Sequence, residues 1–306
     1  MNVTESEVLA METVILSGKA VSRDMKGEMK IEVASLQAEH GLTPGLAVVL
    51  VGEDSASSSY VKGKRRASRK VGIKSDVYHF EPDITEAELL SVIGKLNENS
   101  EIHGILVQLP LPSHLCESVI LNAVKPEKDV DGLHPVNLGR LIRGEDGFIP
   151  CTPYGVQQLL VRSGLEIQGR HIVIVGRSIL VGKPLAALLL RKIPGGNATV
   201  TICHTGTRDL TRYTRQADIL VVAAGRPHTV TADMVSEGTV VVDVGVNRVD
   251  DESSKKGYRL IGDVDFDSVS LKASAITPVP GGVGPMTITM LLYNTILAAK
   301  RARGLA

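Results

Sequence analysis

A basic stretch in the first third of the chain carries side chains suited to proton transfer. Tyr60 and Lys64 are four residues apart, so on a helix they share one face. The neighbouring cations Lys62, Arg65 and Arg66 would lower the pKa of this lysine if it were buried. A lysine with a depressed pKa can act as a general acid or base near neutral pH. The same run is also typical of a solvated helix surface, and these residues alone leave both interpretations open.

Further polar side chains follow an apolar run at residues 105–109. Gln108 stands at the end of this run, where its amide either reaches a ligand or caps a strand. Asp129 and Asp131 flank Val130 in a loop, so the two carboxylates can point in opposite directions. Paired carboxylates can bind a metal ion, but no histidine or further acid stands at ligand spacing. We therefore expect no metal site here.

Residues 172–190 have the order strand, glycine turn, helix. A β-branched run predicts a buried strand, Gly176 ends it, and Pro184 suits the first turn of a helix. This order presents backbone N–H groups and the positive end of a helix to an anion. Five residues separate Gly176 from Gly182, and Pro184 follows Lys183, which excludes a Walker-type loop. Dinucleotide binding is favoured over a plain β-turn-α packing unit.

The next strand indicates which dinucleotide is bound. NAD sites usually carry an acidic residue at the end of the second strand, which accepts a hydrogen bond from the ribose 2′-OH. The corresponding segment here is Cys203-His-Thr-Gly206, without a carboxylate, whereas Arg177 in the turn can pair with a 2′-phosphate. We therefore predict NADP. Glycines at strand ends, Gly225 and Gly245, would let the cofactor's ring and ribose approach closely.

Composition bounds the class of protein. The chain has 306 residues, enough for two domains, and carries 34 Lys+Arg against 34 Asp+Glu. This balance, with no Trp and 3% aromatic residues, argues against a nucleic-acid or membrane-surface partner. No signal peptide and no membrane-spanning run is expected. The three widely spaced cysteines form no zinc or redox pair and suit a reduced, cytoplasmic protein.

Apolar runs alternate with helical patterns along the chain. Strands are expected at residues 46–51, 77–80, 105–109, 172–175, 198–203, 219–223 and 240–244. Helices are expected between them, and this alternation predicts an α/β fold with a mostly parallel sheet. A helix is expected from Val14 to His40, residues 132–153 are expected to be a connection, and a helix at 286–303 is long enough to pack back on the first domain.

Six motifs, in order along the chain, resemble the bifunctional methylenetetrahydrofolate dehydrogenase/methenyltetrahydrofolate cyclohydrolase (FolD) family. They are Tyr60-Val-Lys-Gly-Lys64, Val107-Gln-Leu-Pro-Leu-Pro112, Lys128-Asp-Val-Asp-Gly132, Pro150-Cys-Thr-Pro153, Val175-Gly-Arg-Ser178 and Pro278-Val-Pro-Gly-Gly-Val-Gly-Pro-Met-Thr287. The resemblance implies two α/β domains with a cleft between them that holds the folate. Residues 1–149 plus 286–306 would form the catalytic folate-binding domain, and residues 150–285 a Rossmann-like NADP-binding domain.

The resemblance also assigns roles in the folate site. Lys64 matches the proton-transfer residue, and Gln108 matches its partner. Tyr60 matches the ring that shapes the pocket. Asp131 matches the residue that anchors the amino-pyrimidine edge of the pterin.

Five residues match the family's cofactor site. Gly176, Arg177 and Ser178 correspond to the turn that binds the pyrophosphate and the 2′-phosphate. Thr205 falls where some relatives have Ser. Val246 falls where many relatives have Ile beside the nicotinamide.

The activity that the resemblance implies is the NADP-dependent oxidation of 5,10-methylenetetrahydrofolate to 5,10-methenyltetrahydrofolate, followed by hydrolysis to 10-formyltetrahydrofolate. Tetrahydrofolate one-carbon derivatives would be its partners, and we expect a homodimer. One alternative is another NADP-dependent dehydrogenase with the same cofactor domain, which should lack the coupled set of Tyr60, Lys64 and Gln108. A non-catalytic protein that binds nucleotide without oxidising a substrate is the other alternative.

Overall fold

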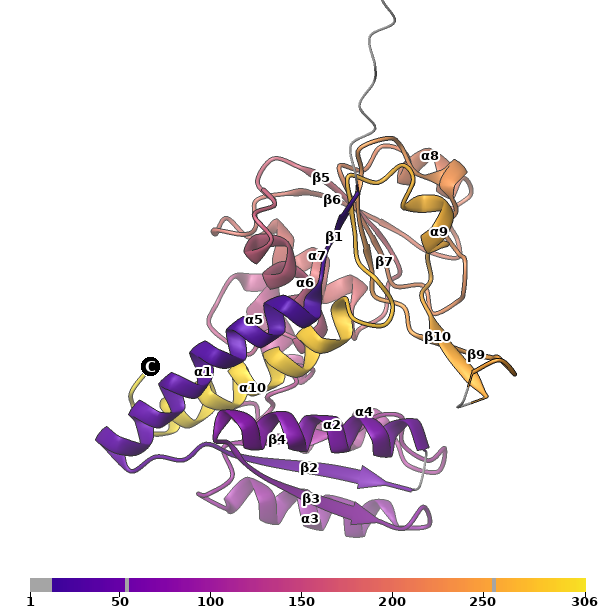
Figure 1. The fold of residues 1–306 in the computed structure, drawn as a ribbon. Helices are drawn as coiled ribbons and strands as arrows, with labels where there is room; N and C mark the ends of the chain where they lie inside the picture. The colour runs from indigo at the N-terminus through magenta and orange to yellow at the C-terminus, as the bar shows by residue number, and fades with distance from the viewer. Residues whose placement is uncertain (1–12, 53–54, 255–256) are drawn as a thin grey trace, which may run out of the picture. The chain divides into compact units, whose positions relative to one another are not determined.

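The computed structural model describes residues 13–52, 55–254 and 257–306, without the side chains of residues 55–59. These residues form two compact units (Figure 1). Unit 1 contains residues 13–17, 170–176 and 199–282, and unit 2 contains residues 18–169, 177–198 and 283–306. The first twelve residues of the expected catalytic domain lie outside the described residues.

Unit 2 is built on a parallel sheet in the order β3 (Lys74–Phe80), β2 (Gly45–Val51), β4 (Gly104–Val107). Every residue of the central strand β2 is buried, as expected for a strand covered on both faces. Alternate residues of β2 enter two different hydrophobic clusters. The expected strands in this half of the chain are therefore confirmed.

Helices cover both faces of this sheet, with α2 and α3 on opposite sides in Figure 1. The helices of unit 2 are α1 (Gly18–His40), α2 (Ser55–Val71), α3 (Glu86–Glu98), α4 (Glu117–Asn122), α5 (Pro135–Arg143), α6 (Cys151–Arg162), α7 (Gly182–Leu190) and α10 (Val283–Ala302). Helix α10 runs beside α1, where the Ser22 and Thr289 hydroxyls lie 2.8 Å apart. The C-terminal helix therefore packs on the first half of the chain, as expected.

Unit 1 contains a second parallel sheet, in the order β1-β11-β8-β7-β5-β6. Its strands are β1 (Val14–Ile15), β5 (His171–Val175), β6 (Thr199–Cys203), β7 (Ile219–Val222), β8 (Val240–Asp243) and β11 (Ala275–Ile276). The chain passes from β5 to β6 on one side and then returns to β7 on the other side. The strand order thus reverses at β5, the position where open α/β sheets bind their ligands.

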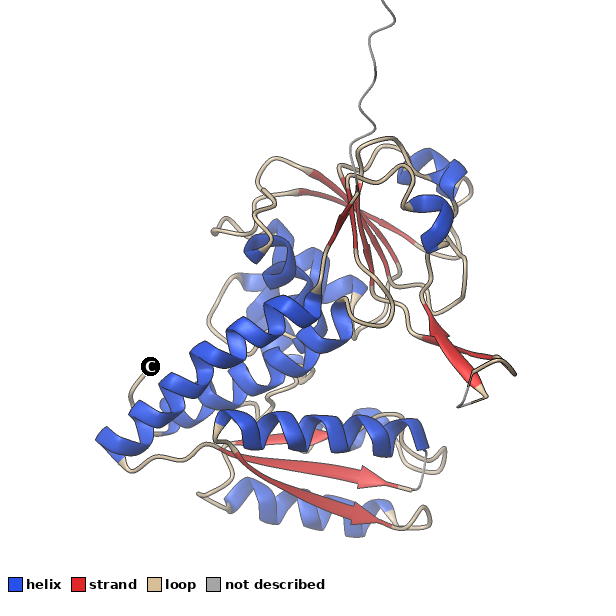
Figure 2. Ribbon diagram, viewed as in Figure 1, coloured by secondary structure: helices blue, strands red, loops and turns tan. Residues whose placement is uncertain are grey.

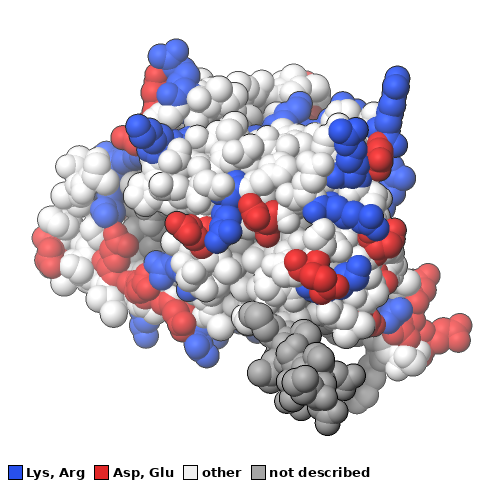
Figure 3. All heavy atoms as spheres, turned by 90° about the horizontal axis from the view of Figure 1, so that it is seen from above, with Lys and Arg blue, Asp and Glu red and all other residues white. Residues whose placement is uncertain are grey.

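Smaller elements complete unit 1. They are α8 (Leu210–Thr214), the 3-10 helix η1 (Ala232–Met234), α9 (Phe266–Val269) and an antiparallel ribbon of β9 (Asn247–Asp250) and β10 (Tyr258–Ile261). The ribbon is drawn in red in Figure 2, apart from the main sheet. Lys and Arg side chains are interspersed with Asp and Glu on the face seen in Figure 3, in keeping with the balanced composition.

Three expectations about the elements were wrong. The helix expected from Val14 begins at Gly18, because Val14 and Ile15 pair with β11 instead. The connection expected at residues 132–153 contains α5, which begins at Pro135 and is capped by the His134 side chain. The ribbon of β9 and β10 was not expected at all, because each strand has only four residues, too few to show a clear apolar pattern.

Candidate functional site

Helix α2 places one member of its basic run inside the protein. Lys64 is only 6% exposed, because its position shares a helix face with the buried residues Val61, Ser68 and Val71. Lys62 and the arginines of the run are exposed. One face of this run is therefore a solvated surface, and on the other face Lys64 is buried, as the prediction of a lysine with a lowered pKa requires.

The Lys64 ammonium lies among the residues expected to accompany it. Its Nζ donates a hydrogen bond of 2.9 Å to Oε1 of Gln108 and lies 5.1 Å from the centroid of the Tyr60 ring. The backbone N–H of Gln108 donates to Val49 O, which extends the ladder beyond the end of β4. The Tyr60 hydroxyl donates to Gly284 O at 3.5 Å. The structure therefore brings together three of the four expected folate-site residues.

Asp131 is the fourth, and it lies close enough for its charge to affect the pKa values of Lys64 and Tyr60. Burial lowers the pKa of Lys64, and the negative charge of Asp131 acts against this shift. Burial raises the pKa of Asp131, and the Lys64 charge acts against that rise. The pKa of Tyr60 is raised by burial and by the Asp131 charge. The lowered pKa expected for Lys64 is therefore present, but its cause is burial rather than the neighbouring cations.

The two carboxylates of the loop have different surroundings. Asp129 is 6% exposed, and its oxygens accept hydrogen bonds from the backbone N–H groups of Leu133 and His134 and from Asn137 Nδ2. Asp131 is half-buried, and the Cys151 side chain lies beside its carboxylate. Asp129 therefore stabilises the loop, whereas Asp131 keeps acceptor capacity for a ligand.

Sequence reasoning missed two residues that hold Asp131 in place. Asn294, 1% exposed on α10, donates from Nδ2 to Val130 O at 2.9 Å and to Ile149 O at 3.0 Å. The Cys151 thiol donates to Val130 O at 3.3 Å, and burial raises its pKa well above the usual value. The available signal was a single Asn within the apolar stretch of residues 290–299.

The turn after β5 has the features expected of a phosphate-binding segment. Gly176 adopts φ 139°, and a Cβ at this position would overlap the carbonyl oxygen of Ala223. Its N–H donates to Cys203 O at 2.8 Å. Ser178 Oγ accepts a hydrogen bond from Val181 N at 3.1 Å, just before α7 begins. Arg177 is exposed, and among the described residues no ion pair engages its guanidinium.

Two of the expected cofactor residues lie at other strand ends of unit 1. Thr205 follows β6, and Val246 follows β8 and is 59% exposed. Both side chains are accessible. Neither has a geometry that by itself identifies a ligand.

A pair of buried carboxylates, which sequence reasoning missed, organises these strand ends. Asp263, fully buried, accepts hydrogen bonds from the N–H groups of Ala224 and Gly225 and from Asn247 Nδ2. A Cβ at Gly245 would overlap the Asp263 carboxylate. The expected reason for this glycine, close approach of the cofactor, is therefore replaced by close packing of a carboxylate.

Asp243 is the second carboxylate of the pair. It is 3% exposed and accepts from the N–H groups of Gly245, Asp263 and Val264. Burial raises its pKa to about 6. The two acids together fix the loops that follow β7 and β8.

Comparison with known proteins decides the family. A model of the tetrahydrofolate dehydrogenase/cyclohydrolase catalytic domain matches residues 16–131, and a model of the NAD(P)-binding domain of the same family matches residues 150–303. The chain belongs to the tetrahydrofolate dehydrogenase/cyclohydrolase family. The resemblance inferred from the six motifs and the expected α/β fold class are both confirmed.

Individual relatives match nearly the whole chain. The bifunctional protein FolD of Dehalococcoides mccartyi (strain CBDB1) is 55% identical over 296 residues, which are 96% of this chain and 99% of the relative. The structure of the bifunctional enzyme FolD, a methylenetetrahydrofolate dehydrogenase/cyclohydrolase from Campylobacter jejuni, is 50% identical with a TM-score of 0.88, covering 94% of this chain and 99% of its own.

A third relative was solved with a cofactor. The methylenetetrahydrofolate dehydrogenase-cyclohydrolase (FolD) of Trypanosoma brucei, complexed with NADP cofactor and inhibitor, is 41% identical with a TM-score of 0.90, covering 95% of this chain and 99% of its own. In the part of this chain that the structure describes, no helix is both long and apolar enough to span a membrane.

Proposed function

We propose that this protein oxidises 5,10-methylenetetrahydrofolate to 5,10-methenyltetrahydrofolate with NADP and then hydrolyses the product to 10-formyltetrahydrofolate. It is a bifunctional dehydrogenase and cyclohydrolase, like the FolD relatives that match its full length. The observation that carries the chemistry is the buried Lys64, hydrogen-bonded to Gln108 and lying against Tyr60. The alternative of a different NADP-dependent dehydrogenase is disfavoured because such an enzyme should lack this coupled set.

Lys64 is our proposal for the group that moves protons in the hydrolysis. Water attacks the cationic methenyl carbon, and the adduct must lose a proton from oxygen and gain one on nitrogen before the C–N bond breaks. A lysine whose pKa is lowered by burial can carry both transfers near neutral pH. Gln108 holds Nζ in one position, and the Tyr60 ring excludes water from one side of it. Hydride transfer, by contrast, requires alignment and no protein acid or base.

Asp131 is our proposal for the folate anchor. The amino-pyrimidine edge of a pterin presents N–H donors, which suit a carboxylate with free acceptor positions. Asp131 has that capacity, whereas Asp129 is occupied by its own loop and by Asn137. Asp129 is therefore disfavoured as an alternative anchor.

The turn at Gly176 fits NADP, which accepts the hydride when bound. Gly176 leaves room for the backbone to approach a pyrophosphate, and Ser178 lies in the turn before α7. The exposed Arg177 guanidinium is available for the 2′-phosphate. We propose that Thr205 and Val246 line the same cofactor, with Val246 beside the nicotinamide.

We propose two functional domains that are defined by the ligand each binds, and their boundaries differ from those of the two compact units. Residues 1–149 plus 286–306 would bind folate, and residues 150–285 would bind NADP. The compact units divide the chain differently, because residues 150–169 and 177–198 belong to unit 2 and residues 13–17 belong to unit 1. The phosphate turn thus spans a boundary between packing units, with Gly176 on one side and Arg177 on the other.

We further propose a cytoplasmic homodimer. Cys116, Cys151 and Cys203 are all free, which suits a reducing compartment. Strand β6 is at an edge of its sheet and exposes the apolar side chain of Ile202, so a second copy could cover it. Light scattering of the purified protein should give twice the chain mass of 32.6 kDa. A value equal to one chain mass would contradict the dimer.

The proposed activity is tested by supplying methylenetetrahydrofolate and NADP to the purified protein. NADPH fluorescence and the methenyl absorbance are recorded together. NADPH should form while methenyltetrahydrofolate stays low, because the second activity removes it. A protein that binds NADP and yields no NADPH would instead be the non-catalytic binding protein.

A further inference from the structure

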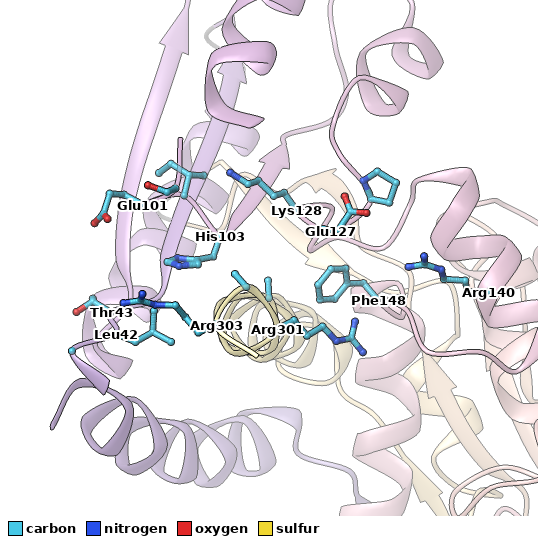
Figure 4. A pocket seen from close by; sticks show the side chains of 16 residues that line it. Leu42, Thr43, Glu101, His103, Glu127, Lys128, Arg140, Phe148, Arg301 and Arg303 are labelled. Atoms are coloured by element: carbon cyan, nitrogen blue, oxygen red, sulfur yellow. The ribbon is translucent and has the colours of Figure 1, made fainter. Parts of the chain in front are cut away.

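Unit 2 contains a cavity at the opposite end of its strands from Lys64. The cavity has a volume of about 590 Å³ (Figure 4). It is lined where β2 begins, by His103 just before β4, and by the last turn of α10. His103 and Gln108 stand at the two ends of β4, and five residues of strand span about 16 Å. The cavity is therefore separate from the proposed folate site.

Cations predominate in the lining of this cavity. Lys128, Arg140, Arg301 and Arg303 contribute four positive charges, whereas the carboxylates of Glu101 and Glu127 contribute two negative ones. Figure 4 shows Arg303 beside His103, with Arg301 and Arg140 on either side of Phe148. The balance of charge favours an anionic ligand.

The arginines of this cavity have their hydrogen-bonding capacity unused. Lys128 already donates to Leu96 O at 3.2 Å and to Asn99 O at 2.7 Å. In the described residues, by contrast, no hydrogen bond or ion pair engages the guanidinium of Arg140, Arg301 or Arg303. Arg301 lies 5.1 Å from the centroid of the Phe148 ring, a contact that orients it without using its N–H groups.

His103 adds a buried donor to the lining. It is 9% exposed, and its Nδ1 accepts a hydrogen bond of 3.0 Å from the backbone N–H of Gly45. The neutral ring therefore carries its proton on Nε2, which has no partner among the described residues. Burial and the nearby Lys128 charge lower the pKa of His103, so the ring stays neutral at physiological pH. Gly45 admits no side chain, because a Cβ would overlap Glu101 O.

We propose that this cavity binds a small anion with at least two phosphate or carboxylate groups, held by Arg140, Arg301, Arg303 and the Nε2–H of His103. Guanidinium groups bind either kind of oxyanion through paired N–H donors. The volume lies within the range of small-molecule sites, and Phe148 supplies an apolar wall. This binding is additional to the proposed activity and does not depend on it.

Calorimetric titration of the full chain tests the proposal. Inorganic pyrophosphate and citrate are titrated separately at constant ionic strength, with saturating NADP present to fill the cofactor turn. We expect saturable binding of one ion per chain for at least one of the two probes. Binding of pyrophosphate alone would identify a phosphate site, and binding of citrate alone would identify a polycarboxylate site.

Matched variants locate the binding. Arg140→Gln and Arg303→Gln should each weaken it about tenfold or more, which corresponds to about 1.4 kcal/mol. Arg143→Gln lies on the same helix as Arg140 but outside the cavity, where it pairs with Glu145, and should change nothing. Arg177→Ala should also leave the affinity unchanged. Three outcomes would overturn the proposal. They are the absence of saturable binding, an affinity in both cavity variants equal to that of the wild type, and loss of binding in Arg177→Ala.

Discussion

Each of the two units buries charged side chains near the carboxyl ends of parallel strands. The two sets differ in how many hydrogen bonds these side chains make. In unit 1, Asp243 and Asp263 each accept three hydrogen bonds, five of the six from backbone N–H groups. In unit 2, the three N–H donors of Lys64 have Gln108 as their acceptor among the described side chains. The first set fixes loops, whereas Lys64 keeps donors free, as its proposed role in proton transfer requires. The two sets therefore differ in how many of their hydrogen-bonding positions are already occupied.

The same contrast occurs within a single loop. Asp129 and Asp131 are two residues apart and both partly or fully buried. The carboxylate of Asp129 is filled by backbone groups and Asn137, whereas that of Asp131 faces the Lys64 charge. Burial raises the pKa of both carboxyl groups, so burial alone does not distinguish them, whereas their hydrogen-bond partners do.

The largest effect on activity should follow from removing the Lys64 ammonium, which has donors without acceptors among the described side chains. Lys64→Met keeps roughly the volume and removes the titrating group, so cyclohydrolase activity should fall by about 10²–10⁴-fold. Dehydrogenase activity should remain measurable, and methenyltetrahydrofolate should accumulate. Lys62→Met, on the exposed face of the same helix, is the control and should change little. Equal slowing of both reactions would make Lys64 a binding residue.

Titration of Asp243, one of the two buried carboxylates of unit 1, should change the free energy of unfolding rather than catalysis. The pKa of Asp243 is about 6 in the folded protein, against an ordinary value of 3.8. The folded state therefore binds this proton more tightly than the unfolded state, so the Asp243 contribution to stability decreases as pH rises from about 4 to 6. The decrease should total about 3 kcal/mol and level off above that range.

Urea unfolding at several pH values measures this contribution, with Asp243→Asn as the reference that cannot titrate. The stability of the wild type relative to the variant should decline between pH 4 and 6. A difference that is constant across this interval would show that Asp243 has an ordinary pKa.

Substitution of the two loop carboxylates, Asp129 and Asp131, should change different measured quantities. Asp131→Asn should raise the folate KM of both activities by about tenfold or more, the scale of a hydrogen bond to a charged group, and leave stability nearly unchanged. Asp129→Asn should instead cost about 1–3 kcal/mol of unfolding free energy, because backbone N–H groups lose their acceptor. If Asp131→Asn lowered stability while KM stayed constant, the distinction between the two would fail.

The smallest effect concerns an exposed charge. Arg177→Ala should weaken NADP binding by about 1–3 kcal/mol, the range for a charge-assisted hydrogen bond. The affinity for NAD, which lacks the 2′-phosphate, should change less and serves as the internal control. Equal loss for both cofactors would assign Arg177 to the pyrophosphate instead.

Sequence reasoning predicted what local pattern determines. The β-branched runs that became β2 and β5 and the glycine turn after β5 were predicted because each is visible within a few residues. The association of Tyr60, Lys64 and Gln108 was implied by family resemblance, and their contact is observed. The domain boundaries and the roles of the site residues stay predictions.

What sequence reasoning missed depends on contacts between distant segments. Strand β1 has two residues and is defined by pairing with β11, about 260 residues later in the chain. The hydrogen bonds of Asn294 to the Asp131 loop and those of Asp263 to the Gly225 turn also join separate parts of the chain. Lys64 is buried and its neighbours are not because of which face of α2 meets the sheet. The sequence of the basic run does not indicate which face that is.

The proposed proton transfer depends on one physical property, the lowering of the Lys64 pKa by burial. Titration of the protein with ¹⁵N-labelled lysine side chains, followed by NMR, measures this directly, and Lys64→Met identifies the resonance. The account predicts a pKa below the ordinary value of 10.5, because the ammonium is removed from water with Gln108 as a neutral partner. A pKa at or above 10.5 would show that the Asp131 charge outweighs burial, and Lys64 could then not exchange protons near neutral pH.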